Sequence, residues 1–343
     1  MTSEAASGRP RAVRWAVRIG LLVLAALVVI AVVRTMHDLN LGSIVAALGR
    51  LRWWEIAALI AALVVRQLLS AVPLTIYIPG VSLGRAVVTD LTALTTAAFA
   101  SAPGKIAARV AIFSSGGTPT GLALAGSVLN TLTMFVARFG VPLFGFLLVA
   151  ITGAYRPLQL VDLVSLVFAA ALVVGMLMVA SARPTAVRLG GWAGRLAQRF
   201  RARVDPTRWA ESFGRFQQDM AGDLPRRLPR AAGVLAVMLL SEFALLLLAF
   251  RFVGVAPSDA STLAIATIFF FAYPLTMFPL QGAGVVDVAI LLSLFGTGGG
   301  PAVDAATAGL LIWRALTVVG PYALAAIAVG IWRLVPGRRR GER

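Results

Sequence analysis

The sequence is divided into apolar runs, most of them long enough to cross a lipid bilayer. A helical crossing needs about 20 consecutive, mainly apolar residues. Runs of this kind occupy 17–33, 53–78, 121–151, 158–181, 229–253 and 303–333. Hydrophobic residues make up 59% of the chain before glycine is counted, whereas soluble domains reach only ~45–50% with glycine included. We therefore predict an all-α, polytopic membrane protein with about six full crossings.

Two further apolar stretches contain a proline that interrupts the helical pattern. The first, 81–115, is dotted with threonine and broken at Pro103 and Gly104; the second, 258–296, is broken at Pro279. A break frees backbone groups that lipid cannot satisfy, so it survives only inside protein or beside a water-filled cavity. These stretches are predicted to form two re-entrant broken helices.

The basic residues concentrate outside the apolar runs. There are 31 basic and 14 acidic residues, and every basic residue except Lys105 is arginine. The arginines gather at the chain ends and in the middle, which argues against a nucleic-acid partner and favours a multi-pass plasma-membrane protein with both termini cytoplasmic. The expected order is basic cytoplasmic tail, first membrane half, basic cytoplasmic linker, second membrane half and basic tail, at 1–16, 17–181, 182–228, 229–335 and 336–343.

The side chains of common enzyme mechanisms are almost absent. The chain has no cysteine and a single histidine, His37, which we expect to be a solvated loop residue beside Asp38. Thiol catalysis, thiolate metal sites and histidine-dependent acyl transfer or phosphatase chemistry therefore lack candidate residues. No nucleotide-binding or metalloprotease motif occurs. We expect no enzyme activity, no cofactor and no metal.

A shift of 176 residues aligns the two halves at several of their least common residues. The aligned pairs are Arg66 and Glu242, Ser82 and Ser258, Pro103 and Pro279, and Arg138 and Arg314. Charges are rare at membrane depth, so their coincidence with a proline carries more weight than apolar matches would. With cytoplasmic termini and linker, the broken segments enter from opposite faces, as in an inverted repeat with its site near the midplane. Arg34, Arg50 and Arg52 would then lie outside, so the orientation of 34–52 stays open.

Charged residues inside the apolar runs are the candidates for function. Each costs about 2.5–3.5 kcal/mol at a helix centre on insertion scales, so it needs a partner, water or a substrate. They are Arg66, Arg138, Glu242, Asp287 and Arg314, with Lys105 and Arg109 just past the first break. The repeat would bring Arg66 and Glu242 together as a buried charge pair, whose role as structural or functional is left open. The remaining cations outnumber Asp287, which favours an anionic ligand, most simply a lipid phosphate held by arginine's planar fork of donors.

A glycine-containing turn follows the second break. Pro279 opens the sequence Pro-Leu-Gln-Gly-Ala-Gly-Val-Val-Asp, in which Gly282 and Gly284 allow close backbone approach and Asp287 ends the motif. A half-helix starting here would point free N–H groups at an anion. Apolar helices also use glycine to pack, and the motif alone favours that packing role.

At these residues the chain resembles the membrane region of the lysylphosphatidylglycerol synthetase and flippase family. That family carries a Pro-Gly-Gly-x-Gly-x-x-Glu turn and then a helix with Arg-x-x-Thr-x-x-x-Pro. The matching positions are Gly282, Gly284, Asp287, Arg314, Thr317 and Pro321 in the second half and Pro103, Gly104 and Arg109 in the first. Leu280 and Gln281 replace the Pro-Gly, and Asp287 replaces the glutamate. The resemblance covers about 17–335 and implies the stand-alone form, without the aminoacyl-transferase domain of the best understood members.

Together these features predict a lipid translocase that moves a phospholipid, or a polyprenyl-linked or glycosylated lipid, between leaflets. The predicted substrate-binding residues are Arg109, Arg138, Arg314, Gly282, Gly284, Asp287 and Thr317. No nucleotide site is present, so the expected driving force is a lipid gradient or the membrane potential, with Asp287 or Glu242 as proton carriers. The alternative is a non-transporting membrane partner that holds a lipid substrate for a separate envelope glycosyltransferase or synthase.

Overall fold

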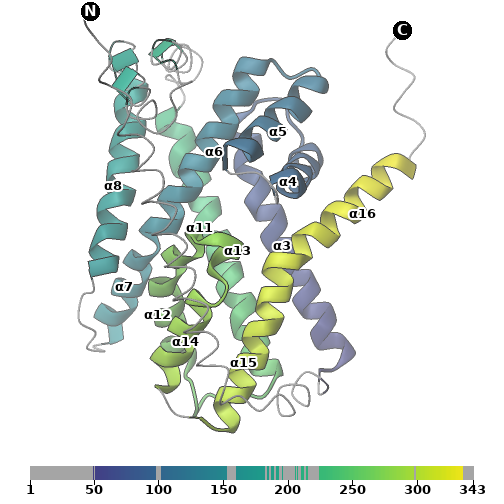
Figure 1. The fold of residues 1–343 in the computed structure, drawn as a ribbon, viewed down its shortest axis with the longest axis vertical. Coiled ribbons are helices and arrows are strands. Elements are labelled where there is room, and N and C mark those ends of the chain that lie inside the picture. Colours follow the sequence, from purple (N-terminus) through teal and green to yellow (C-terminus); the bar gives the residue numbers. More distant parts are fainter. Residues whose placement is uncertain are drawn as a thin grey trace, which may run out of the picture. The chain divides into compact units, whose positions relative to one another are not determined.

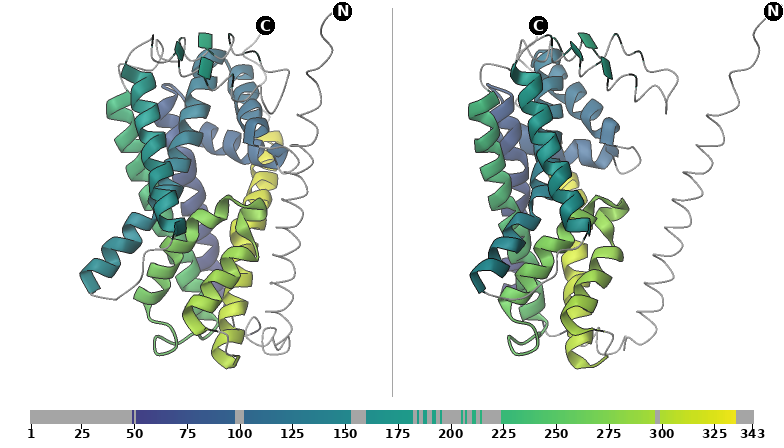
Figure 2. Two further views of the ribbon diagram at one scale, coloured as in Figure 1. Left: turned by 60° about the vertical axis from the view of Figure 1, so that its left-hand side comes forward. Right: turned by 90° about the vertical axis from the view of Figure 1, so that its left-hand side faces the viewer.

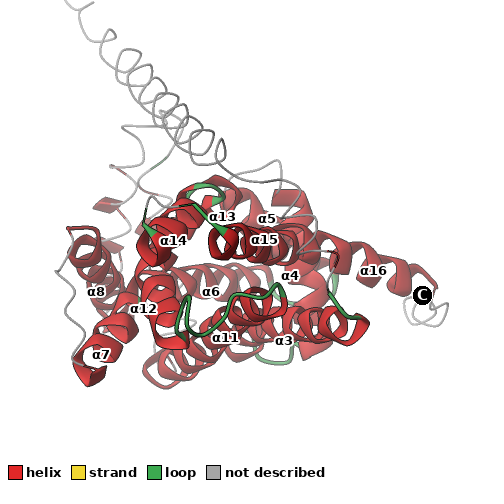
Figure 3. Ribbon diagram, turned by 90° about the horizontal axis from the view of Figure 1, so that it is seen from below, coloured by secondary structure: helices red, strands yellow, loops and turns green. Residues whose placement is uncertain are grey.

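The computed structural model describes most of the two predicted membrane halves, and every regular element in the described residues is helical (Figure 3). The described stretches are 51–97, 102–152, 160–181, 224–296 and 299–334, with isolated positions at 49 and between 184 and 214. The predicted first crossing at 17–33, the segment 39–48, both basic tails and most of the linker lie outside the described residues. The all-α prediction is confirmed for the part of the chain that is described.

Each half contributes a series of helices in the same order. The first half has α3 (Trp53–Tyr77), α4 (Leu83–Ala97), α5 (Ala102–Ser115), α6 (Thr120–Gly140), α7 (Pro142–Thr152) and α8 (Leu160–Ser181). The second half has α11 (Leu224–Phe252), α12 (Thr262–Ala272), the 3₁₀ turn η1 (Tyr273–Met277), α13 (Pro279–Gly282), α14 (Val285–Phe295), α15 (Pro301–Arg314), the π-helical turn η2 (Ala315–Val319) and α16 (Gly320–Leu334). In both halves a long helix is followed by short helices and then by an interrupted long helix. The short helices are α4 and α5 in the first half and α12, η1, α13 and α14 in the second, and among the described elements α8 has no counterpart in the second half.

The chain divides into two compact units, and the charged residues of interest all lie in the larger one. The larger unit comprises residues 40–172 and 226–343, and the smaller comprises residues 1–39 and 173–225. The boundary at residue 172 falls within α8. The site described below is built entirely from the larger unit.

Four of the described helical segments are long and apolar enough to cross a membrane. They are Trp53–Tyr77, Thr120–Thr152, Leu224–Phe252 and Pro301–Ala328, and shorter apolar helices cover Leu163–Met176, Thr262–Met277 and Val285–Phe295. Many large apolar side chains on these segments are exposed, among them Leu147, Val167 and Ile327. In water such exposure would be unfavourable, but it suits contact with lipid tails. The chain is thus a membrane protein with several apolar helices.

Both long helices that were predicted as continuous are interrupted shortly after an arginine. The predicted helix 121–151 is split into α6 and α7 at Val141, directly before Pro142. The predicted helix 303–333 contains the π-helical turn η2, directly before Gly320 and Pro321. Proline has no N–H and its ring clashes with the carbonyl four residues earlier, so it disturbs the helix at this point. Hydrophobic periodicity cannot reveal such a local change.

The two predicted re-entrant stretches are each a pair of short helices. Pro103 lies in the first turn of α5 and Pro279 is the first residue of α13, where a missing N–H costs no intrahelical hydrogen bond. The α4–α5 pair lies toward one end of the larger unit and the α12–α14 pair toward the other (Figures 1 and 2). Helices α3 and α11, which precede these pairs, run in opposite directions (Figure 1).

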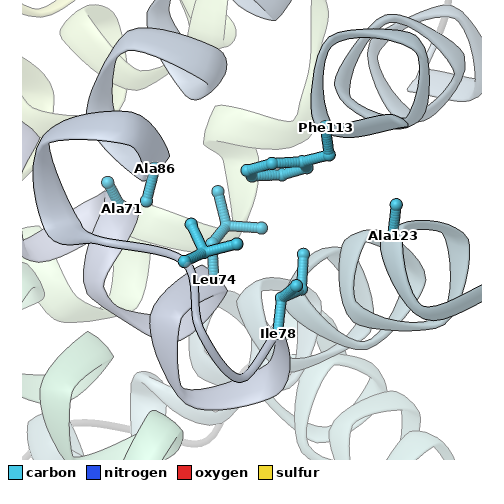
Figure 4. Close-up of a cluster of buried hydrophobic side chains, with 7 residues drawn as sticks. Ala71, Leu74, Ile78, Ala86, Phe113 and Ala123 are labelled. Carbon is cyan, nitrogen blue, oxygen red and sulfur yellow. The ribbon is translucent and has the colours of Figure 1, made fainter. Parts of the chain in front are cut away.

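A small hydrophobic core fixes the first pair of short helices to its neighbours. Leu74 and Ile78 at the end of α3 pack with Ala86 of α4, Phe113 of α5 and Ala123 of α6 (Figure 4). Each of these five side chains has no exposed surface. This packing holds α4 and α5 in one position beside α3 and α6, and so positions the charged residues that the two short helices carry.

Candidate functional site

An ion pair joins the two halves in the interior of the larger unit. Arg66, near the middle of α3, places its Nε 3.3 Å from Glu242 Oε2 on α11. The hydroxyl of Tyr273, on η1, donates a hydrogen bond of 2.8 Å to the same carboxylate oxygen. Glu242 is 1% exposed, so its charge depends on these two groups for compensation. The two residues that the repeat aligned are therefore in contact.

A second ion cluster lies within the first pair of short helices. Asp90 on α4 accepts hydrogen bonds from Nε and Nη2 of Arg109 on α5, the first at 3.1 Å. Lys105, one turn earlier on α5, places its Nζ 3.2 Å from Asp90 Oδ1. Gln67 of α3 donates to Asp90 Oδ2 at 3.5 Å. One carboxylate thus holds two cations from the facing helix.

The remaining donors of Arg109 reach α6. Its Nη1 donates to Thr131 Oγ1 at 3.5 Å. With the Asn130 amide oriented so that its oxygen faces the guanidinium, that oxygen accepts from Nη1 at 3.1 Å. Arg109 is only 4% exposed and is held by Asp90, Asn130 and Thr131. This arginine was predicted to bind substrate, and the structure gives it protein partners instead of open donors.

Arg138 differs from the other interior arginines. It lies on α6, and among the described residues it has neither a hydrogen bond nor an ion pair. Its Nε is buried without a partner, and its charge interacts electrostatically with Tyr273. The residue as a whole is half-buried, and a buried donor such as Nε is costly unless an acceptor is supplied from elsewhere.

These groups form one connected set, which we call the central charge cluster. It consists of Arg66, Asp90, Lys105, Arg109, Arg138 and Glu242. The two ion clusters adjoin on α3, because Gln67, which donates to Asp90, directly follows Arg66, which pairs with Glu242. Four cations face two carboxylates, so the cluster has a surplus of two positive charges.

The turn after Pro279 is built from residues in the left-handed backbone region. Gln281, Gly282 and Gly284 have φ values of 57°, 70° and 86°. At Gly282 an added Cβ would also collide with the carbonyl oxygen of Leu275, so no other residue fits there. The amide of Gly284 donates to Asp287 Oδ2 at 2.7 Å, which caps the start of α14.

Arg314 holds this turn together. Its Nε donates to Asp287 Oδ1 at 2.8 Å and to Oδ2 at 3.1 Å. Its Nη1 donates to the carbonyl of Gln281 at 2.8 Å, and its Nη2 donates to that of Gly282 at 3.5 Å. The predicted site residues Arg314, Asp287, Gly282 and Gly284 are therefore brought together, with most of their polar groups bonded to one another.

Thr317 takes part in this arrangement through its backbone. Its side chain is fully buried and donates to the carbonyl of Trp313 at 2.8 Å. Its own carbonyl accepts from Gln281 Nε2 at 3.1 Å. Pro321, four residues later, has no N–H for that carbonyl, so the side chain of Gln281 takes its place. Thr317 was predicted to contact substrate, but in the structure both its side chain and its carbonyl are bonded within the protein.

Sequence reasoning missed Asp90 and the role of Gln281. A signal for Asp90 was available, because it is the only acidic residue between 81 and 115 and precedes Lys105 and Arg109 by 15 and 19 residues. No comparable signal marked Gln281, because its importance depends on a left-handed φ and on a carbonyl 36 residues away. Among the described residues, no group of three or more acidic, histidine or cysteine side chains could hold a metal ion.

Comparison with known proteins gives one match. The family model described as the lysylphosphatidylglycerol synthase TM region matches residues 17–325. No curated protein and no solved structure matches the chain. The match covers both halves and every member of the central charge cluster.

Proposed function

The chain belongs to the family of the lysylphosphatidylglycerol synthase TM region, and from that premise we propose that it moves a lipid with an anionic headgroup between the leaflets of the plasma membrane. The family consists of membrane proteins of lipid metabolism or translocation. In this proposal the cargo is a phospholipid or a polyprenyl-linked or glycosylated lipid, and the protein is not an enzyme. The headgroup crosses within the protein while the acyl or prenyl chains stay in lipid.

The observation that carries the proposal is the central charge cluster with its surplus of positive charge. Asp90, Lys105 and Arg109 come from the first pair of short helices, and Tyr273 comes from the second. Charges at membrane depth are expensive and concentrate on substrate pathways. Broken helices that meet around such charges are the usual site of transport in membrane carriers. An anionic headgroup would compensate the surplus.

An inverted repeat supplies the two access routes of the proposal. Two observations support it: α3 and α11 run in opposite directions, and the two pairs of short helices lie toward opposite ends of the larger unit (Figure 1). The arginine-rich tails and linker favour cytoplasmic termini and a cytoplasmic linker. The first broken segment would then enter from the cytoplasmic side and the second from outside. Rocking of one half against the other would expose the cluster to each face in turn.

Within this mechanism the interior arginines have different tasks. Arg138 is the headgroup ligand, because its donors are open among the described residues. Arg109 and Arg314, bonded to Asp90 and Asp287, shape the site and contact the headgroup only if those bonds rearrange. Glu242 and Asp287 are held by arginines, so the lipid gradient or the membrane potential is the simpler driving force.

A leaflet-resolved assay tests the proposal. The protein is reconstituted into vesicles with a fluorescent phosphatidylglycerol, and the rate at which label moves between leaflets is measured. The unaltered protein should accelerate this movement over empty vesicles. Arg138→Gln should slow it about tenfold or more, equivalent to about 1.4 kcal/mol, and Arg138→Lys should recover only part because a point charge lacks the planar fork.

Arg230→Gln serves as the matched control, since Arg230 is an exposed arginine on α11. It should move lipid at the unaltered rate. If the protein binds lipid but never changes the leaflet distribution of any lipid class offered, translocation is wrong and the role of a lipid-holding partner for an envelope glycosyltransferase or synthase takes its place.

A further inference from the structure

The charge balance of the central charge cluster restricts which headgroup fits it. Arg66 is matched by Glu242, and Arg109 by Asp90. Lys105 and Arg138 remain as the two surplus cations. The Asp287–Arg314 pair is balanced by itself and adds nothing to this surplus. A ligand that restores neutrality at this depth must bring two negative charges.

Lys105 is only partly used by its protein contacts. Its ammonium has three donors, and the acceptor it contacts, Asp90 Oδ1, also accepts from Arg109 Nε and Nη2. Its side chain is 29% exposed, the highest value among the ion-paired members of the cluster. Lys105 can therefore turn donors toward a ligand without leaving Asp90 unpaired.

The packing register of α5 on α6 gives the expected separation of Lys105 and Arg138. Ser114 of α5 contacts Thr120 of α6 and Arg109 contacts Thr131, so the two helices run antiparallel and Arg109 lies level with Thr131. Lys105 is one turn before Arg109 on α5. Because the helices are antiparallel, Lys105 lies level with a point one turn beyond Thr131 on α6. Arg138 lies about one further turn along, about 5 Å by the helical rise. Both side chains are long enough to reach one phosphate group.

The proposed repeat gives a second argument for this placement. At the 176-residue shift, Lys105 corresponds to Gln281 and Arg138 to Arg314. Arg314 Nη1 donates to the carbonyl of Gln281 at 2.8 Å, so these two positions are adjacent there. In the second half the side chain of Gln281 donates to the carbonyl of Thr317, and that of Arg314 donates to Asp287. In the first half the same two positions carry cations, and Ala111 stands where Asp287 would.

We infer that Lys105 and Arg138 form an anion site for a headgroup with two negative charges, a phosphomonoester or a diphosphate on a lipid. This inference rests on the proposed function and names its substrate class. A headgroup with one negative charge would leave half of the surplus uncompensated. A lysylated phosphatidylglycerol, whose headgroup has a net positive charge, would add to it. The site therefore selects against the aminoacylated lipid from which the family takes its name.

Binding to purified protein in detergent tests the inference. The probes are phosphatidic acid, phosphatidylglycerol, lysylphosphatidylglycerol and farnesyl diphosphate, with inorganic diphosphate as a competitor without a lipid chain. Phosphatidic acid and farnesyl diphosphate should bind at least tenfold more tightly than phosphatidylglycerol, and lysylphosphatidylglycerol should bind weakest. Inorganic diphosphate should compete at least tenfold less well than farnesyl diphosphate, and equal competition would assign the site to a soluble anion instead of a lipid.

Substitutions locate the preference within the protein. Lys105→Gln and Arg138→Gln should each reduce phosphatidic acid binding about tenfold and reduce phosphatidylglycerol binding less, so the preference disappears in the double variant. Lys105→Arg should retain the preference, and so should the control Arg230→Gln. Thermal unfolding of each variant separates loss of binding from loss of fold, and Lys105→Arg provides a variant with the charge kept if Lys105→Gln does not fold.

The outcomes separate this inference from the proposed function. If vesicle assays show that the protein moves phosphatidylglycerol or lysylphosphatidylglycerol faster than phosphatidic acid, the dianionic site is wrong while translocation stands. If both glutamine variants retain the full preference for phosphatidic acid, the preference has another origin and the assignment to Lys105 and Arg138 is overturned. If no lipid is moved but phosphatidic acid binds as expected, the site stands and translocation fails.

Discussion

Arg138 and Arg314 are aligned by the shift of 176 residues between the two halves but have different surroundings. Arg314 donates to Asp287 and to two backbone carbonyls, which ties α15 to the turn before α14. Arg138 has no hydrogen bond or ion pair among the residues described. The second half thus uses its arginine to hold its own turn, whereas the first half leaves the donors open.

The interruptions of the two long helices also differ between the halves. Pro142 splits α6 from α7, whereas before Pro321 the helix continues through a π-helical turn. Gln281 donates to the carbonyl of Thr317, for which Pro321 has no N–H, and so supports the helix at the π-helical turn. At the corresponding first-half position, Lys105 contacts Asp90. In the second half the ion pair of Arg314 is supplemented by two backbone carbonyls, whereas in the first half two cations of α5 share the carboxylate of Asp90.

The largest expected effect tests whether the two halves are inverted at all. Because the chain contains no cysteine, single-cysteine variants give a clean background. Ser82 and Ser258 are exposed and are aligned by the shift of 176 residues. Ser82→Cys should react with a membrane-impermeant thiol reagent only from the cytoplasmic side and Ser258→Cys only from outside, an all-or-none difference in intact cells. Labelling of both from one face would make the halves a parallel duplication or unrelated, and the midplane site would lose its basis.

Removing one carboxylate from each half should destabilise the first half more. Asp90→Asn leaves Lys105 and Arg109 without a counter-charge, so the loss should approach the upper end of about 3–5 kcal/mol known for broken buried pairs. Asp287→Asn should cost about 1–3 kcal/mol, because Arg314 keeps two backbone carbonyls. Unfolding in detergent measures both.

Asp304→Asn is the control for these two variants, since Asp304 lies in the first turn of α15. It should cost less than about 1 kcal/mol, the value of a charge at a helix terminus. Equal losses for the Asp90 and Asp287 variants would contradict the view that the backbone carbonyls bonded to Arg314 compensate for the loss of its carboxylate partner.

The contact between the halves should show a positive coupling energy. Arg66→Gln or Glu242→Gln alone leaves one buried charge, with a loss of about 3 kcal/mol by analogy with soluble proteins. The double variant removes both charges and should recover most of that loss. A double-mutant cycle on thermal unfolding gives the coupling. Strict additivity would mean that the contact of 3.3 Å contributes nothing to stability.

The smallest expected effect concerns Gln281, which adopts a left-handed φ of 57°. Gln281→Ala loses the hydrogen bond to Thr317 and keeps the unfavourable backbone, so it should cost about 1–2 kcal/mol. Gln281→Gly loses the same bond but relieves the backbone, so its stability should lie within about 1 kcal/mol of the unaltered protein. If Gln281→Gly is less stable than Gln281→Ala in the same unfolding assay, the left-handed backbone at this position is not the source of the cost.

The sequence alone determined that the protein lies in a lipid bilayer, that it is helical and which family it belongs to. Apolar runs of sufficient length leave few alternatives, because unsatisfied backbone groups are excluded from lipid and helices satisfy them locally. Pro103 and Pro279 lie in the first turns of α5 and α13, where the missing N–H of proline costs no hydrogen bond. The repeat aligned Arg66 with Glu242, and the residues Gly282, Gly284 and Arg314 pointed to the family that the comparison identified. Each of these conclusions can be drawn from the residues of one segment or from the comparison of two segments of the sequence.

Only the tertiary structure decided how the charges are shared. Asp90 contacts two cations of α5, Arg314 donates to carbonyls 32 and 33 residues earlier, and the Nε of Arg138 is left without a partner. Sequence predicted an excess of positive charge but assigned Arg109, Arg138 and Arg314 the same role. Electrostatic pairing depends on distances of a few ångströms between helices, and these follow from packing around side chains such as Leu74 and Phe113. Periodicity fixes which face of a helix is polar, but not which neighbour that face meets.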